Sequence, residues 1–400
     1  MGRQGNQSSS EGARSPLSSF LSRAFIIITM AHVYVGWSLI PDIPAAFSVK
    51  GICIVILLVS ILLIPSRLLI RRYTEDPILT DRVAWASSLT MGWFSSLFVL
   101  TLIRDTVLLV AGSHIWAADS ALVAILVSFV VTLIGFINAR RLARVVHVSI
   151  PLVNLPHALD GFTIVQITDV HVGPTIKEGY VRRIVERVNQ LDADMIAITG
   201  DVVDGRVEHL HLDTAPLADL KSRHGSFIVT GNHEYYSGAD EWITEFQKLG
   251  LRTLLNDHVV IEHQDVELVI AGVNDFGASN IHESHDSDPV AALQGSPARM
   301  LKVLLAHQPR SAHAAEAAGF DLQLSGHTHG GQFWPWNHFV RIQQPFTAGL
   351  NQLGNLWIYT SRGTGYWGPP KRFGAPSEIT LIKLAAIPAG TTLYRDDHRV

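Results

Sequence analysis

Five short clusters of polar side chains stand out in this 400-residue sequence, because each follows an apolar, strand-like run. They contain Asp169 and His171, Asp201 and Asp204, Asn232 and His233, His307, and His327 and His329. Carboxylate, imidazole and amide oxygen together suit a divalent ion such as Mn, Fe or Zn, and these donors exceed what one ion usually takes. We therefore expect two ions, about 3.5 to 4 Å apart, bridged by one carboxylate.

The spacing within the clusters indicates how the side chains are presented. In DVH and HTH the outer residues are two positions apart, so an extended segment would direct both side chains to the same side. Neighbouring glycines allow sharp turns and leave space for ions; they are Gly200, Gly231, Gly326, Gly330 and Gly331. A lone histidine such as His307 is more often structural than a ligand. The succession of five clusters nevertheless favours a metal centre.

Buried strands must position these clusters. The sequence predicts strands at residues 162–168, 194–199, 226–230, 301–306, 320–324, 357–360 and 378–384. It predicts helices at 181–191 and 241–249, and a hairpin that turns near Gln264 and Asp265. Strands that alternate with helices indicate an α/β sheet with helices on its faces, in which ligands bind beyond the C-terminal ends of the strands.

The first 140 residues are more apolar. Four stretches of 17 to 21 residues are each long enough to cross about 30 Å of hydrocarbon as a helix. They are residues 24–40, 45–64, 83–103 and 120–138. Buried helices of a soluble core are the alternative, and Arg104 with Asp105 counts against a clean third span. Residues 1–22 are rich in Ser, Gly and Gln, which is typical of a disordered tail.

Charge indicates a topology and argues against one class of partner. Arginines cluster before the first span, between the second and third, and after the fourth, so the positive-inside rule places both termini on the cytoplasmic side. Residues 150–400 contain 19 Lys/Arg and 28 Asp/Glu, a net charge of −9, which argues against a nucleic-acid partner. The single cysteine, Cys53, excludes an internal disulfide.

The motifs DVH, GDVVD, GNHE, AHQP and GHTHGGQ together resemble those of the calcineurin-like metallophosphoesterase superfamily. Residues 359–384 further resemble the bacterial branch typified by the YaeI and YkuE phosphodiesterases. The resemblance implies a four-layer α/β/β/α sandwich with two metal ions. We expect this catalytic domain at residues 148–386, after a tail (1–22) and an all-α transmembrane region of about four helices (23–147), and before a C-terminal tail (387–400).

The resemblance also implies a role for each clustered residue. One ion is held by Asp169, His171 and His329, the other by Asn232, His307 and His327, with Asp201 bridging. His233 stabilises charge on the phosphate or protonates the leaving oxygen, and Asp204 holds it in place. Manganese is the favoured metal. In the protein phosphatase branch an arginine follows the second aspartate, whereas Gly205 stands there in this sequence, which disfavours a phosphoprotein substrate.

These features predict a membrane-anchored phosphohydrolase in which metal-activated hydroxide attacks a phosphodiester or pyrophosphate in line. Aromatic residues at 333–339 and 366–367 are either core or an apolar rim that contacts a lipid or lipid-linked nucleotide. A phosphodiesterase for soluble nucleotides and a non-catalytic membrane scaffold are the alternatives. The bacterial branch implies a bacterial inner membrane, with the catalytic domain on its cytoplasmic side. No oligomeric state is predicted.

Overall fold

The computed structural model describes residues 16–388, apart from residues 71, 72, 75 and 113. The chain divides after residue 130 into two compact units. Most of the two predicted tails, residues 1–15 and 389–400, lies outside the described residues. Helix α1 begins at Pro16, and strand β12 ends at Ile387.

The predicted apolar stretches coincide with four helices: α1 (Pro16–Leu39), α2 (Phe47–Leu69), α3 (Pro77–Ala111) and α4 (Ala117–Arg140). Three of them, α2, α3 and α4, are long and apolar enough to cross a membrane, and α1 is not among these three. The start of α3 is fixed locally, because the Asp76 side chain accepts hydrogen bonds from the amides of Ile78 and Leu79.

The charged pair in α3 is satisfied within the first unit. Arg104 is buried and forms ion pairs with Asp42 and with Asp105, the latter at 2.8 Å. Its guanidinium also donates to the Ser120 hydroxyl at 3.0 Å and to the Ser38 hydroxyl at 3.1 Å. Because charged side chains within membrane helices are tolerated when they pair with one another, this pair is compatible with a spanning α3.

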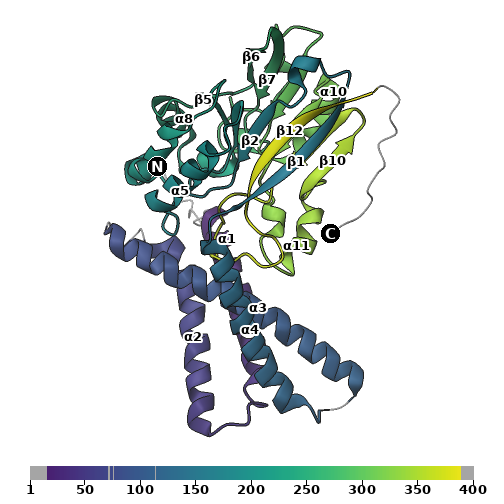
Figure 1. Ribbon diagram of the computed structural model, residues 1–400. Coiled ribbons are helices and arrows are strands. Elements are labelled where there is room, and N and C mark those ends of the chain that lie inside the picture. Colours follow the sequence, from purple (N-terminus) through teal and green to yellow (C-terminus); the bar gives the residue numbers. More distant parts are fainter. Residues whose placement is uncertain (1–15, 71–72, 75, 113, 389–400) are drawn as a thin grey trace, which may run out of the picture. The chain divides into compact units, whose positions relative to one another are not determined.

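Two six-stranded sheets form the second unit. The first contains, in spatial order, β1 (Arg144–Val153), β12 (Glu378–Ile387), β2 (Thr163–Ile167), β3 (Met195–Thr199), β4 (Ser226–Val229) and β5 (Arg252–Thr253). The second contains β10 (Gly349–Leu353), β11 (Leu356–Thr360), β9 (Leu322–Ser325), β8 (Leu301–Leu305), β7 (Val266–Gly272) and β6 (Asp257–His263). Figure 1 shows β12, in yellow, beside β1.

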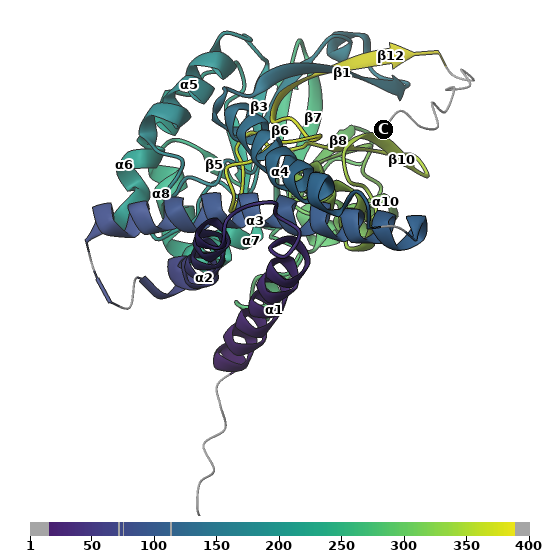
Figure 2. The ribbon, with the colours of Figure 1, turned by 90° about the horizontal axis from the view of Figure 1, so that it is seen from below.

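Helices cover the outer face of each sheet, and the two inner faces pack together. On the first sheet, α5 (Glu178–Asn189), α6 (Val207–Thr214) and α8 (Ala239–Lys248) bury side chains such as Ile184 and Trp242. Between the sheets, Ile164 and Phe227 share a core with Leu305 and Leu324. Helix α10 (Ala312–Ala318) covers the second sheet on the side away from α5, α6 and α8 (Figure 2). The predicted four-layer sandwich is confirmed.

All seven predicted strands and both predicted helices of this unit form, with ends shifted by a few residues. The predicted hairpin is β6–β7, and its turn residues Gln264 and Asp265 have φ of 52° and 62°, the pair of positive values that a tight hairpin turn requires. Strand β1 was not predicted as part of the sheet. It pairs in parallel with β12 from Arg144 onward, four residues before the expected start of the catalytic domain.

Candidate dinuclear metal site

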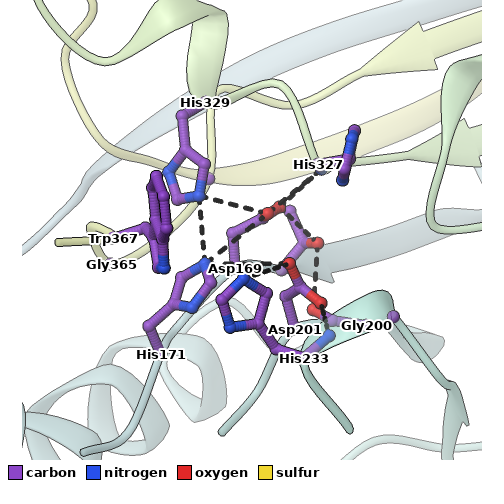
Figure 3. A network of polar contacts seen from close by, with 12 residues as sticks. Asp169, His171, Gly200, Asp201, His233, His327, His329, Gly365 and Trp367 are labelled. Atoms are coloured by element: carbon purple, nitrogen blue, oxygen red, sulfur yellow. Dashed lines mark hydrogen bonds and ion pairs between the residues drawn. The ribbon is translucent and has the colours of Figure 1, made fainter. Parts of the chain in front are cut away.

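The polar clusters meet in the second unit because the strands before them are neighbours. β2, β3 and β4 are adjacent parallel strands in one sheet, as β8 and β9 are in the other, and one cluster follows each strand. Direct contacts connect eight of the nine predicted site residues, and the ninth, Asn232, stands between Gly231 and His233 beside Asp201. Figure 3 shows Asp169, His171 and His329 gathered around the same centre as Asp201 and His327.

The backbone at the clusters is left-handed, so the prediction of extended DVH and HTH segments was wrong. Positive φ values between 51° and 68° occur at Asp169, His171, Asp201, His327 and His329. Such values are strained for residues other than glycine, and they persist where surrounding contacts impose them. The amide of Asp169 donates to the Gly200 carbonyl at 3.0 Å, for example. A side chain at Gly326 would collide with Asp169 and Thr168, so a glycine is required there.

Asp169, His171 and His329 form the first donor group. Their ligand atoms lie within 4.8 Å of one another, and all three residues are buried. Nε2 of His329 is 3.3 Å from Oδ1 of Asp169 and 3.0 Å from Nε2 of His171. Nδ1 of His171 lies 2.8 Å from Oδ1 of Asp204, a contact in which the ring can donate from Nδ1 and present the Nε2 lone pair to an ion.

Asp201, His307 and His327 form the second donor group, again within 4.8 Å of one another. Nε2 of His307 is 3.1 Å from Oδ2 of Asp201, while its Nδ1 lies 2.8 Å from the Thr199 carbonyl oxygen. A carbonyl only accepts, so Nδ1 carries the hydrogen, and Nε2 is the ring nitrogen that faces Asp201 and would face an ion held there. Oδ1 of Asn232 is buried and has no hydrogen-bond partner among the described residues, as expected of an oxygen that a metal would occupy.

His233 lies beside the two donor groups. Its Nδ1 is 2.6 Å from Oδ1 of Asp204, and its Nε2 is 4.0 Å from Oδ2 of Asp201. Burial alone would lower the pKa of His233, but Asp201 and Asp204 outweigh it and raise the pKa to about 9. Conversely, His171 and His233 lower the pKa of Asp204 despite its burial. Asp204 therefore remains a carboxylate that holds two imidazoles.

Glu234 has a structural role that the sequence did not reveal. Its buried carboxylate accepts hydrogen bonds from the amides of Gly231, Asp201, Val202 and Val203, at 2.7 to 3.2 Å. It thereby ties the start of helix α7 (Asn232–Ser237) to the loop that carries Asp201. Burial, with Asp201 nearby, raises the pKa of Glu234 to about 7.

Arg372 is a second residue that sequence reasoning missed. The guanidinium is fully buried and donates to carbonyl oxygens of Gly365, Arg362 and His329, at 2.5 to 3.1 Å. Nη2 also lies 2.9 Å from Nδ1 of His329. Burial and Arg372 together lower the pKa of His329 well below its usual value, which keeps this imidazole neutral.

The aromatic residues near the site divide between core and rim. Phe333 and Tyr366 are buried, whereas Trp336, Phe339 and Trp367 are exposed. The rings of Trp367 and Tyr236 lie 5.8 Å and 5.4 Å from the His233 ring. Tyr236 was not predicted as a residue of the site. The only indication in the sequence is its position, three residues after the GNH motif.

The charges of the centre fit divalent cations. Burial raises the pKa of Asp169, and the nearby Asp201 adds to this effect because two buried carboxylates repel each other. Burial would also raise the pKa of Asp201, but His307 and His233 lower it well below the usual value. Two buried carboxylates, four imidazoles and an amide oxygen without a hydrogen-bond partner among the described residues form a donor set of the kind that Mn, Fe or Zn prefers.

Comparison with known proteins agrees with this geometry. The family model of the calcineurin-like phosphoesterases matches residues 162–331. A Danio rerio protein named "Transmembrane protein with metallophosphoesterase domain" is 36% identical over 269 residues, covering 65% of this chain and 62% of that protein. The uncharacterized metallophosphoesterase YkuE of Bacillus subtilis is 29% identical over 238 residues, which cover 58% of this chain and 81% of YkuE.

The extent of the match differs between relatives. This chain spans about three fifths of the length of the first two relatives, at 62% of each. It spans 91% of an uncharacterized metallophosphoesterase of Aquifex aeolicus, at 32% identity over 243 residues that cover 60% of this chain. The fold, the donor set and these relatives lead to one conclusion: the chain belongs to the calcineurin-like metallophosphoesterase family.

Proposed function

We propose that this protein is a membrane-anchored, dinuclear-metal phosphohydrolase that cleaves a phosphodiester or pyrophosphate bond. The observation that supports this most directly is the convergence of two donor groups, with Asp201 of the second group 3.9 Å from His171 of the first and His233 beside them. The proposed catalytic domain comprises residues 148–386. Helices α2, α3 and α4 would provide the membrane anchor.

Each ion would be held by one histidine that a second contact already orients and by further ligands around it. In this proposal Asp169, His171 and His329 hold one ion, Asn232, His307 and His327 hold the other, and Asp201 bridges them. When bound, such ions polarise the phosphate and activate water at neutral pH. The contacts from Asp204 to His171 and from Thr199 to His307 would keep Nε2 of each ring directed at its ion. We favour manganese among the metals that suit these donors.

His233 would donate a proton to the leaving oxygen. It is not needed as a ligand in this arrangement, and the raised pKa keeps it protonated at neutral pH. Asp204 would fix the ring through Nδ1, so that Nε2 carries the proton that is transferred.

The substrate that we propose is a lipid or a lipid-linked nucleotide, of which UDP-diacylglucosamine is an example. Trp367 and Tyr236, which are 47% and 67% exposed, flank His233 and offer flat apolar surfaces on the side of the leaving group. A membrane anchor would keep the site at a high local concentration of such a substrate. The arginine pattern supports a cytoplasmic catalytic domain, and the bacterial relatives are consistent with a bacterial inner membrane.

The test uses the full chain in detergent micelles, stripped of metal and resupplied with Mn²⁺. Hydrolysis of bis(p-nitrophenyl) phosphate is expected to depend on metal and to be lost in Asp201→Asn, while the exposed control His211→Ala retains it. Trp367→Ala is expected to raise KM for UDP-diacylglucosamine in mixed micelles and to leave KM for the small diester unchanged.

Two other results would each support a different function for this protein. Metal-dependent cleavage of soluble nucleotides, without activity on lipid in micelles, would support a soluble-nucleotide phosphodiesterase. Two bound ions without turnover of any phosphoester would support a non-catalytic membrane scaffold.

A further inference from the structure

A separate group of metal-binding side chains lies outside the catalytic centre. Asp240, in the first turn of α8, and two histidines of the loop after β7, His282 and His285, offer ligand atoms within 4.8 Å of one another. None of the three belongs to the motifs of the catalytic centre. They join two segments that are more than 40 positions apart in the sequence.

Both imidazoles direct the same ring nitrogen at one carboxylate. Nε2 of His282 is 3.4 Å from Oδ2 of Asp240, and Nε2 of His285 is 4.0 Å from Oδ1. The two ring centroids are 3.9 Å apart. Ligands of a tetrahedral zinc ion, bound at about 2.0 to 2.1 Å, lie roughly 3.3 to 3.4 Å from one another, so small side-chain rotations would suffice to close this group around an ion.

The opposite nitrogen of each ring is held by a hydroxyl group. Nδ1 of His282 lies 3.0 Å from Oγ of Ser284, and Nδ1 of His285 lies 3.1 Å from the hydroxyl oxygen of Tyr235. In the tautomer with hydrogen on Nδ1, each ring donates to its hydroxyl and presents the Nε2 lone pair toward Asp240. Outer contacts of this kind orient the histidine ligands of metal sites.

A simple ion pair between protonated histidines and Asp240 explains the arrangement less well. Two imidazolium rings at this separation would repel each other.

We propose that Asp240, His282 and His285 form a third metal site, which takes a zinc-like divalent ion through two imidazole nitrogens and one carboxylate. The Asp240 side chain is 67% exposed, so water completes the coordination. The bound ion ties the loop after β7 to α8 and, through Tyr235, to α7. It is a stabilising clamp, separate from the two ions of the catalytic centre.

The experiment counts zinc in the full chain in detergent micelles, after metal stripping, zinc addition and removal of unbound ion. The wild type is expected to hold three ions per chain, and His282→Ala and Asp240→Asn two each. The exposed His211→Ala is the matched control and keeps three. Ser284→Ala keeps all three ligands but binds the third ion about 10-fold or more weakly in a calorimetric titration.

The outcomes separate this proposal from the catalytic assignment. Asp201→Asn is expected to lose ions of the catalytic centre and to keep the ion that His282→Ala removes. His282→Ala is expected to retain metal-dependent hydrolysis, which also shows that it is folded. The third site is wrong if His282→Ala and Asp240→Asn both bind as much zinc as the wild type, whatever the total number of ions per chain.

Discussion

Oδ1 of Asp204 lies 2.6 Å from Nδ1 of His233, and this contact links the proposed acid to the metal centre. The same oxygen lies 2.8 Å from Nδ1 of His171, which belongs to the first donor group. One buried carboxylate oxygen thus fixes both a proposed ligand and the proposed proton donor. A change at this oxygen is therefore expected to affect catalysis more than metal content.

Asp204→Asn is expected to lower kcat by about 10- to 100-fold, because an amide oxygen holds two imidazoles less firmly than a carboxylate does. Bound metal at saturating Mn²⁺, measured by elemental analysis, is expected to change little, since Asp204 is not a proposed ligand, while the affinity for the first ion should fall because Asp204 orients His171. In a double-mutant cycle with His233→Ala, the combined loss should be smaller than the product of the separate losses. Fully multiplicative losses would show that Asp204 does not act through His233.

His233→Ala is expected to lower kcat by about 10²- to 10⁴-fold for a diester with an alkyl leaving group, because such a group must be protonated as it departs. The loss should be much smaller for bis(p-nitrophenyl) phosphate, whose leaving group departs as an anion. Rates over a series of leaving groups measure the difference. An equal loss across the series would instead assign His233 to the stabilisation of charge on the phosphate.

The ligand candidates were predictable because each follows a strand directly, and parallel neighbouring strands place the loops after them together. Arg372 was not predictable in this way. It lies 43 positions after His329 and reaches that residue because the loop between β11 and β12, which contains it, crosses from the second sheet to the first. Glu234 stands within a motif, but its partners are backbone amides, which leave no signal in residue types. The left-handed backbone at Asp169 and His171 is likewise set by tertiary contacts.

Glu234→Gln is expected to destabilise the protein by about 1 to 3 kcal/mol, because the new amide group turns an N–H donor toward backbone donors and leaves at least one of them unpaired. Thermal unfolding of the metal-free protein measures this loss, and Glu241→Gln on the exposed side of α8 is the matched control. Metal affinity should fall as well, since Glu234 holds the amide of Asp201. Unchanged stability would mean that Glu234 is already protonated and that its charge is not required.

Lys371 makes stability depend on pH in a defined direction. Burial lowers its pKa from 10.5 to about 8, although Nζ contacts the Thr132 hydroxyl at 3.2 Å and the Phe333 ring at 4.9 Å. Between these two pKa values the unfolded chain binds the proton that the folded protein has lost, so stability rises with pH, by about 1.4 kcal/mol per unit at most. Below the folded value both states are protonated, and the contribution of Lys371 no longer changes with pH.

Lys371→Met removes this titration and keeps most of the side-chain volume. The Tm of the wild type relative to Lys371→Met is therefore expected to rise as the pH increases from about 8 to about 10. Both proteins are melted as full chains in the same detergent, so that all other titrating groups cancel in the difference. A Tm difference that stays constant over this range would show that Lys371 keeps its ordinary pKa, and that Thr132 and Phe333 compensate for its burial.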